Sequence, residues 1–376
     1  MSEEKSLFSE VSSSSQRAEN QVETMFQNRQ EEFNNESNLA NVKSKVIDHD
    51  LSLGNDARSK YFRSRRLNAR INLKVSKSLV SNLTIPKDWY DSCQDMDVRP
   101  EMLSNIVQEF NNNTDVKIKY KGLVGIRKLL SLPTNPPIQE VIDLGLVSQF
   151  IDLLGNSYAE FEYESLWCLT NVACGTSDQA NAILSKGGLE KIKLLMDSKI
   201  EEVQEQATWT LGNLAGDSIK VRDAVINQGG FQKLITIFAT ANRKNLVKQC
   251  AWSVSNFCRN KPILPYEMLR KALDYVIKSV NLFFDDTEIL VDATWTLSTI
   301  SENYKKSIKE IIDSNILPKI LACLEKEHQI IILSCLRVIG NIAAGDANQT
   351  QLLLDIGVLN YLKKTIFHPK KSIRKD

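Results

Sequence analysis

The sequence predicts an all-α protein built as a right-handed α-solenoid, because one helical pattern recurs at a fixed interval. Trp167, Trp209, Trp252 and Trp295 follow one another in steps of 42, 43 and 43 residues. Around them, apolar residues recur every three or four positions, the period of an amphipathic helix, and no β-type alternation of useful length occurs. A fixed repeat of this length indicates small helical units that stack into an array.

Helix-breaking residues divide this pattern at nearly the same interval. Five of them occur, at Gly145, Gly187, Gly229, Asn315 and Gly357. Gly or Asn at such a place suits the left-handed conformation in which one helix ends before the next begins. The interval leaves room for one more breaker, and there "NKPILPYEM" carries Pro262 and Pro265 instead. That stretch predicts a lengthened connection between two helices.

A unit of 42 or 43 residues with two or three helices has the size of armadillo and HEAT repeats. We expect armadillo-type repeats over 100–368, with the last helix of each unit lining a concave groove. About six units are placed at 116–156, 157–198, 199–241, 242–284, 285–326 and 327–368. Residues 369–376 would then begin a further, truncated repeat.

The residues before the array differ from it in composition. Residues 1–56 are polar, with eleven acidic and five basic side chains, and we expect disorder there. Residues 57–87 contain nine Lys or Arg and no acidic residue. Within them, "RRLNARINLKVSK" (65–77) predicts a basic amphipathic helix that forms on a partner. A solvated basic linker is the alternative.

Composition excludes several classes of function. The net charge of +1 gives no bulk field toward nucleic acid or membrane, and no uninterrupted apolar run reaches eighteen residues. The N-terminus lacks the apolar stretch of a secretory signal. Seven scattered cysteines without a CxxC pair indicate free thiols. Three distant histidines predict no metal site, and no catalytic or cofactor-binding motif occurs, so we expect neither an enzyme nor a cofactor.

Asparagines accompany the tryptophans at a fixed distance. Asn171, Asn213 and Asn256 each stand four residues after a tryptophan, and Asn341 continues the series after a gap at Thr299. Four residues turn an α-helix by about 400°, so each pair shares one face of its helix. Stacked units would therefore carry two parallel ladders, one of tryptophans and one of asparagines. Alternatively, each Trp belongs to the core and each Asn makes a structural bond to a helix turn.

These ladders predict a site for an extended, basic peptide. An asparagine amide can donate to and accept from a peptide backbone without reading its side chains. Indoles one helix-packing distance apart form slots for Lys and Arg side chains, through cation–π contacts of about 0.5–2 kcal/mol each. Asp217, Glu288 and Asp292 lie close to the ladders in sequence and would select positive charge. Taken singly, each of these acids is more often a solvated surface charge.

The ladder segments resemble a known family. "ESLWCLTNVACGTSDQ", "EQATWTLGNLAGDSIKVRD" and "CAWSVSNFCRNK" are similar to the second, third and fourth armadillo repeats of importin-alpha, the nuclear import adaptor. "LRVIGNIAAGDANQTQ" resembles its sixth repeat, with Arg337 in the place of the ladder tryptophan.

The resemblance implies three groups of binding residues. The major groove for a nuclear localisation signal would use Trp167, Asn171, Gly175, Gln206, Trp209, Asn213, Asp217, Trp252 and Asn256, with Arg259 nearby. A partial minor groove would use Glu288, Asp292, Trp295, Arg337 and Asn341. The importin-beta-binding segment would use Arg58, Lys60, Arg63, Arg65, Arg66, Arg70, Lys74 and Lys77.

The implied partners are basic localisation signals of cargo proteins, importin-beta and the transport machinery of the nuclear pore. The protein would shuttle between cytoplasm and nucleus, without binding nucleic acid or membrane directly. Three departures from the family pattern stand out: Ala180 replaces a threonine near the lysine pocket, "SLVSNLTIPK" replaces a basic cluster, and the sequence stops within what would be a seventh repeat. An armadillo scaffold without transport coupling is therefore the alternative function.

Overall fold

The computed structural model describes residues 84–375, apart from positions 95, 113, 156 and 157. The chain divides into two units, Met1–Ser59 and Lys60–Asp376, and every described residue belongs to the second. The tail predicted over 1–56 and the eight cations assigned to the importin-beta-binding segment lie outside the described residues. Over the described range all regular elements are helices, and no strand occurs there.

Helices follow one another along the second unit in short steps. Before the first predicted repeat come α4 (Lys87–Gln94), the 3-10 helix η1 (Pro100–Met102) and α5 (Leu103–Phe110). The next helices are α6 (Val116–Leu130), α7 (Ile138–Asp143), α8 (Leu146–Leu153), α9 (Ala159–Ala173), α10 (Ser177–Ser185), α11 (Gly188–Leu195), α12 (Glu201–Ala215), α13 (Ile219–Asn227) and α14 (Gly230–Thr240). The last are α15 (Lys244–Phe257), α16 (Tyr266–Leu282), α17 (Thr287–Asn303), α18 (Lys305–Asp313), α19 (Leu317–Cys323), α20 (Gln329–Ala343), α21 (Ala347–Asp355), α22 (Val358–Ile366) and α23 (Lys371–Lys375).

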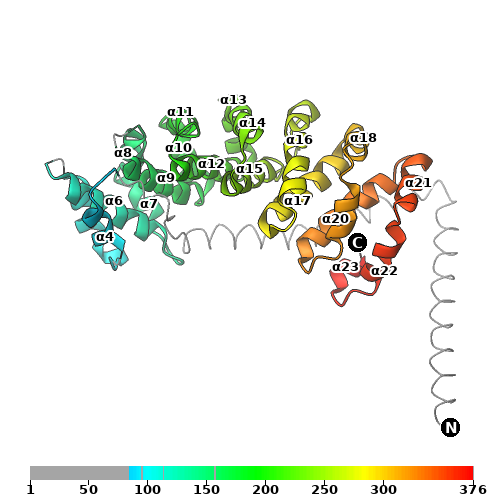
Figure 1. The fold of residues 1–376 in the computed structure, drawn as a ribbon. Coiled ribbons are helices and arrows are strands. Elements are labelled where there is room, and N and C mark those ends of the chain that lie inside the picture. Colours follow the sequence, from blue (N-terminus) through cyan, green and yellow to red (C-terminus); the bar gives the residue numbers. More distant parts are fainter. Residues whose placement is uncertain (1–83, 95, 113, 156–157, 376) are drawn as a thin grey trace, which may run out of the picture. The chain divides into compact units, whose positions relative to one another are not determined.

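One helix of each unit packs against the corresponding helix of the next. α6, α9, α12, α15, α17 and α20 form one continuous layer in this order, and we call them the ladder helices. The shorter helices α8, α11 and α14 form a second row, and α7, α10 and α13 form a third (Figure 1). This arrangement is the armadillo-repeat α-solenoid that the sequence predicts.

One expectation about the helices is wrong. With the predicted unit boundaries, the helices that carry the tryptophans and asparagines are the first of their units, not the last. The tryptophan helices α9, α12, α15 and α17 begin directly after those boundaries, at Ala159, Glu201, Lys244 and Thr287. The physical reason is that a stacked array has no intrinsic start. The spacing of repeated residues gives the length of the repeat but not which helix comes first in a unit.

The breakers have the predicted conformation. The φ angles of Gly145, Gly187, Gly229 and Gly357 lie between 71° and 79°, and that of Asn315 is 56°. All five residues are therefore left-handed, a conformation that glycine adopts without cost and asparagine tolerates. The lengthened connection is also confirmed, because α15 ends at Phe257 and α16 begins only at Tyr266.

The core runs along the whole array. Its buried side chains extend from Ile85 before α4 to Ile373 in α23. All seven cysteines are free, and six of them are buried as the sequence predicts for small apolar thiols. Among the residues that the structure describes, no helix has both the length and the apolar composition needed to cross a membrane. In the same residues, no cluster of His, Cys, Asp or Glu side chains is arranged to hold a metal ion.

Two mid-helix glycines differ sharply in their surroundings and give a matched test of this packing. A Cβ atom on Gly122 in α6 would lie 2.2 Å from the backbone nitrogen of Phe110 in α5, whereas one on Gly340 in α20 would meet nothing within 4 Å. We expect Gly122→Ala to destabilise the fold by about 1–3 kcal/mol through overpacking. Gly340→Ala should stabilise it by about 0.5–1 kcal/mol, because alanine restricts the unfolded chain.

Urea unfolding followed by circular dichroism measures both changes. The unfolding midpoint should fall for Gly122→Ala and rise for Gly340→Ala. Equal midpoints for the two variants would show that α5 and α6 do not approach as closely as the structure has them.

Candidate functional site

The predicted ladder residues lie on neighbouring helices of one layer. α9 carries Trp167 and Asn171, and the same pair recurs on α12 and α15. α17 carries Trp295, and α20 carries Arg337 and Asn341. Because each ladder helix packs on the next, these residues come from adjacent helices although they are about 40 positions apart in sequence. We call the side of the layer that carries them the ladder face.

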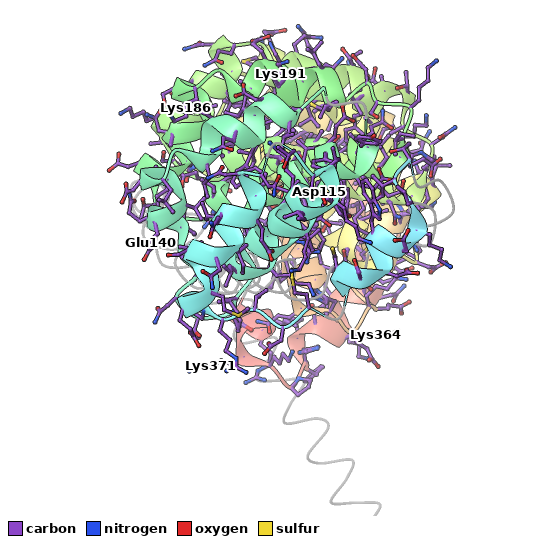
Figure 2. The ribbon with its side chains drawn as sticks, turned by 90° about the vertical axis from the view of Figure 1, so that its left-hand side faces the viewer. Asp115, Glu140, Lys186, Lys191, Lys364 and Lys371 are labelled. Atoms are coloured by element: carbon purple, nitrogen blue, oxygen red, sulfur yellow. The ribbon has the colours of Figure 1, made fainter. Side chains whose placement is uncertain are left out.

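The indoles differ in burial. Trp167, Trp252 and Trp295 are 3%, 1% and 5% exposed, while Trp209 is half-buried. The charged side chains labelled in Figure 2, such as Lys186 and Lys191, are instead exposed. A tryptophan in a core and a tryptophan in a binding slot can both be buried. The contacts of each ring face therefore carry more information than the buried area.

Trp167 has a guanidinium on one ring face. Arg127, from α6, places its guanidinium carbon 4.5 Å from the centre of the Trp167 ring. Glu164 holds that guanidinium with two hydrogen bonds, from Nε at 2.7 Å and from an NH2 nitrogen at 3.3 Å. Tyr163 lies edge-on to the indole, with ring centres 5.8 Å apart. Burial by itself lowers the pKa of Arg127, but the charge and hydrogen bonds of Glu164 outweigh it and raise that pKa overall.

Sequence reasoning missed Arg127, although a signal was present. Arg127 stands 40 residues before Trp167, and Ser131 stands 40 residues before Asn171. Since the repeat interval is 42 or 43 residues, Arg127 and Ser131 lie less than one helical turn past the places that correspond to Trp167 and Asn171. At the other end of the series Arg337 takes the tryptophan's place, and its guanidinium lies 5.4 Å from the ring centre of Trp295.

Three of the ladder asparagines make hydrogen bonds with their amide nitrogens. The Nδ2 of Asn171 donates to the Ser131 hydroxyl at 3.0 Å, and that of Asn341 donates to the Ser301 hydroxyl, also at 3.0 Å. The first bond joins α9 to the C-cap residue of α6, and the second joins α20 to α17. Asn213 instead donates to the carbonyl oxygen of Trp209 in its own helix, at 3.2 Å. The amide nitrogens of these three asparagines therefore fit the alternative in which each Asn makes a structural bond within the fold.

Asn256 is different. Its side chain is fully buried, and within the described residues neither Nδ2 nor Oδ1 has a hydrogen-bond partner. The buried Oδ2 of Asp217 likewise finds no partner in that part of the chain. Arg259 donates to the carbonyl oxygen of Gly216 at 3.3 Å and so brings the end of α15 beside the turn that holds Asp217. Unpaired buried polar atoms cost free energy and are common where a ligand completes the bonding.

Two other predicted residues lie in joints of the fold. Gln206 is buried and donates from Nε2 to the hydroxyl of Thr170 at 2.8 Å, which links α12 to α9. Gly175 precedes the capping box that starts α10, in which Thr176 and Gln179 bond each other's backbones. A Cβ on Gly175 would lie 2.1 Å from the Gln179 Oε1 atom, so a larger residue there would displace the Gln179 side chain from the capping box.

The acids assigned to the minor groove have charged or polar neighbours. Glu288 pairs with Lys248 at 3.2 Å, and Asp292 accepts from the Ser255 hydroxyl at 3.3 Å. Asp292 is fully buried beside the ladder, one turn before Trp295. Ala180, which stands where the family has threonine, is buried in α10.

A hollow of about 390 Å³ lies between α11 and α14, where Leu194, Lys193 and Lys233 are among its lining residues. No ladder residue lines it. Lys193 pairs there with Glu190 and Lys233 with Asp197, so its charges are already balanced.

Comparison with protein families gives two matches within the array. The model of the armadillo/beta-catenin-like repeat matches residues 134–174. The model of the SIL1/FES1/HPBP1 C-terminal domain matches residues 179–278. Both matches fall on helices that contribute to the stacked layers.

Curated relatives share longer stretches. Importin subunit alpha-3 of Arabidopsis thaliana is 34% identical over 295 residues, which are 77% of this chain and 54% of the relative. Importin subunit alpha-B of Dictyostelium discoideum is 40% identical over 252 residues, which are 66% of this chain and 48% of the relative. By sequence, the chain is related to the importin alpha subunits. It spans about half the length of the importin alpha relatives that it matches.

Solved structures share the fold. An engineered protein superposes with a TM-score of 0.62 at 22% identity, over 73% of this chain and 66% of that one. A designed armadillo repeat protein, in complex with the peptide (KR)4, superposes with a TM-score of 0.55 at 20% identity, over 64% of this chain and 98% of that one. At these identities the likeness concerns the arrangement of helices alone.

The two kinds of ladder asparagine in this importin alpha relative can be told apart by stability. Asn256→Ala removes no hydrogen bond made within the described residues, and alanine is the better helix former. The free energy of unfolding should therefore stay equal or rise by roughly a few tenths of a kcal/mol. Asn171→Ala removes the bond to Ser131 and should cost about 1 kcal/mol. Urea titration of both variants measures the difference. A clear loss of stability in Asn256→Ala would mean that this amide serves the fold.

Proposed function

We propose that the protein is a nuclear import adaptor that binds basic localisation signals on its ladder face and connects them to importin-beta. The observation that carries this proposal is the Asn256 amide, which is buried on the ladder face without a hydrogen-bond partner among the described residues. A peptide backbone offers both the donor and the acceptor that this amide needs.

The chemistry of the ladder face favours positive charge in the guest. Indole rings attract cations to their faces, and Trp167 and Trp295 each have a guanidinium within 6 Å of the ring centre. Asp217 adds a carboxylate oxygen that lacks a partner in the described part of the chain. The designed armadillo protein with the same arrangement of helices was solved with the basic peptide (KR)4, which supports a guest of this kind.

The relationship to importin subunits supports transport as the purpose of such binding. It also supports a binding protein rather than an enzyme. In this proposal the segment 57–87, with its nine basic residues, binds importin-beta, and the protein shuttles between cytoplasm and nucleus. An armadillo scaffold without this coupling is the second candidate, because the match to the armadillo repeat and the likeness to solved structures concern the helical array alone.

Peptide binding is tested with a lysine-rich localisation-signal peptide and fluorescence anisotropy. Trp209 is half-buried, so its replacement by alanine spares the core. We expect Trp209→Ala to weaken binding by about three- to thirtyfold, the equivalent of one cation–π contact. Trp89→Ala is the matched control, because Trp89 is also half-buried but lies on α4, which is not a ladder helix.

The same titration at rising ionic strength tests the role of charge. Affinity should fall as salt rises, since salt screens charges over about 8–10 Å. If neither the peptide's charge nor Trp209 affects binding, the scaffold function is favoured instead.

Coupling to importin-beta is tested by pull-down. The full chain should retain importin-beta, and the triple variant Arg65→Ala, Arg66→Ala, Arg70→Ala should lose most of it. A deletion of residues 1–83 is the second arm. It must stop there because Thr84 donates its backbone N–H to the buried Glu160 at 2.6 Å and so belongs to the fold. Equal capture by all three proteins would contradict the assignment of the basic segment.

A further inference from the structure

The first rung of the tryptophan ladder is covered on one side by the chain itself. The ladder helices follow in the order α6, α9, α12, and each packs on the next. Arg127 comes from α6 and Trp167 from α9, so the guanidinium reaches the indole from the side opposite α12. The indole face toward α6 therefore already has a cation 4.5 Å from its centre.

That cation is held in place by a buried ion pair. Arg127 is 7% exposed and Glu164 is 1% exposed, and two hydrogen bonds of 2.7 and 3.3 Å join them. A planar guanidinium gripped by a carboxylate and stacked on an indole is oriented on two sides at once. Glu164 lies three residues before Trp167 on α9, so acid and indole stand on neighbouring turns of one helix.

We propose that Arg127 is a specificity-determining residue that closes the ladder, by filling the cation slot that Trp167 and Glu164 would otherwise offer to a guest. The slots left for a guest then begin on the α12 side of Trp167. The position of Arg127 would therefore determine where a bound basic peptide must end or turn, and how many of its cations the ladder face can bind. The inference rests on the proposed function for the identity of the guest, but the slot itself is testable without any peptide.

The far end of the ladder supports this assignment. Arg337 on α20 takes the repeat position of tryptophan, and its guanidinium lies 5.4 Å from the ring centre of Trp295. Each terminal indole is stacked by a cation from the next helix outward.

The slot is tested by chemical rescue. Arg127→Ala leaves Glu164 beside an uncovered indole, so methylguanidinium should bind there and raise the melting temperature by a few degrees. The wild type should show no such rise, because its own guanidinium fills the slot. The double variant Arg127→Ala, Glu164→Gln is the matched control without the acid, and it should show none either. Equal rises in all three proteins, or no rise in a folded Arg127→Ala, would overturn the proposal.

A second variant covers the case in which Arg127→Ala does not fold. Arg127→Ser keeps a hydroxyl that can donate toward Glu164 directly or through water, and it leaves both the acid and the indole face open to a guest cation. A basic peptide is then lengthened by one lysine at either end. Lengthening toward Trp167 should improve binding to this variant by about two- to fivefold and leave the wild type unchanged. The same gain in both proteins would show that Arg127 does not close the ladder.

The two experiments separate this inference from the proposed function. If the wild type binds no basic peptide, the adaptor function fails, yet the rescue by methylguanidinium still decides whether Arg127 fills a cation slot. If peptides bind and the rescue fails, the adaptor function stands and the role given to Arg127 falls.

Discussion

The contact between successive ladder helices is the constraint on which the rest of this structure depends. It is made by small side chains that bond across one repeat. Thr170 and Thr210 share a hydrogen bond of 2.7 Å, as do Thr294 and Ser334. Ser253 donates to the carbonyl oxygen of Thr208 at 3.0 Å, and a Cβ on the neighbouring Gly212 would lie 2.4 Å from the Ser253 hydroxyl. These bonds fix the register of each helix against the next, and therefore the spacing of everything the ladder helices carry.

Function and packing share the same positions in this array. Asn171 and Asn341 use their amide nitrogens to join neighbouring repeats, whereas Asn256 has no such bond within the described residues. A repeated residue can therefore serve the fold in one unit and remain available to a guest in another. The same division applies to the cations, since Arg127 is neutralised by a buried acid while the proposed guest would bring its own charge. A solenoid permits this because each repeat contacts mainly its neighbours.

Much of the fold followed from the sequence, because it depends on local chemistry that repeats. The interval of 42 or 43 residues, the left-handed breakers and the long connection before Tyr266 are all present in the structure. The positions of the ladder residues on adjacent helices followed from the same interval. The order of helices within a unit did not follow from the sequence, because a repeat interval does not say which helix comes first. The role of Arg127 did not follow from the sequence either, because its contact with Trp167 depends on how α6 packs on α9.

By itself, the sequence determined the helical array, its repeat length and the residues that share a ladder face, since these follow from helix geometry and from spacing along the chain. Only the tertiary structure decided which ring faces are covered, which amides are bonded and which charges are paired. Arg127 and Glu164 are 37 positions apart in sequence, yet they meet on one indole because α6 packs on α9. Pairings of this kind depend on how two helices meet, and a linear pattern records only the distance between residues along the chain.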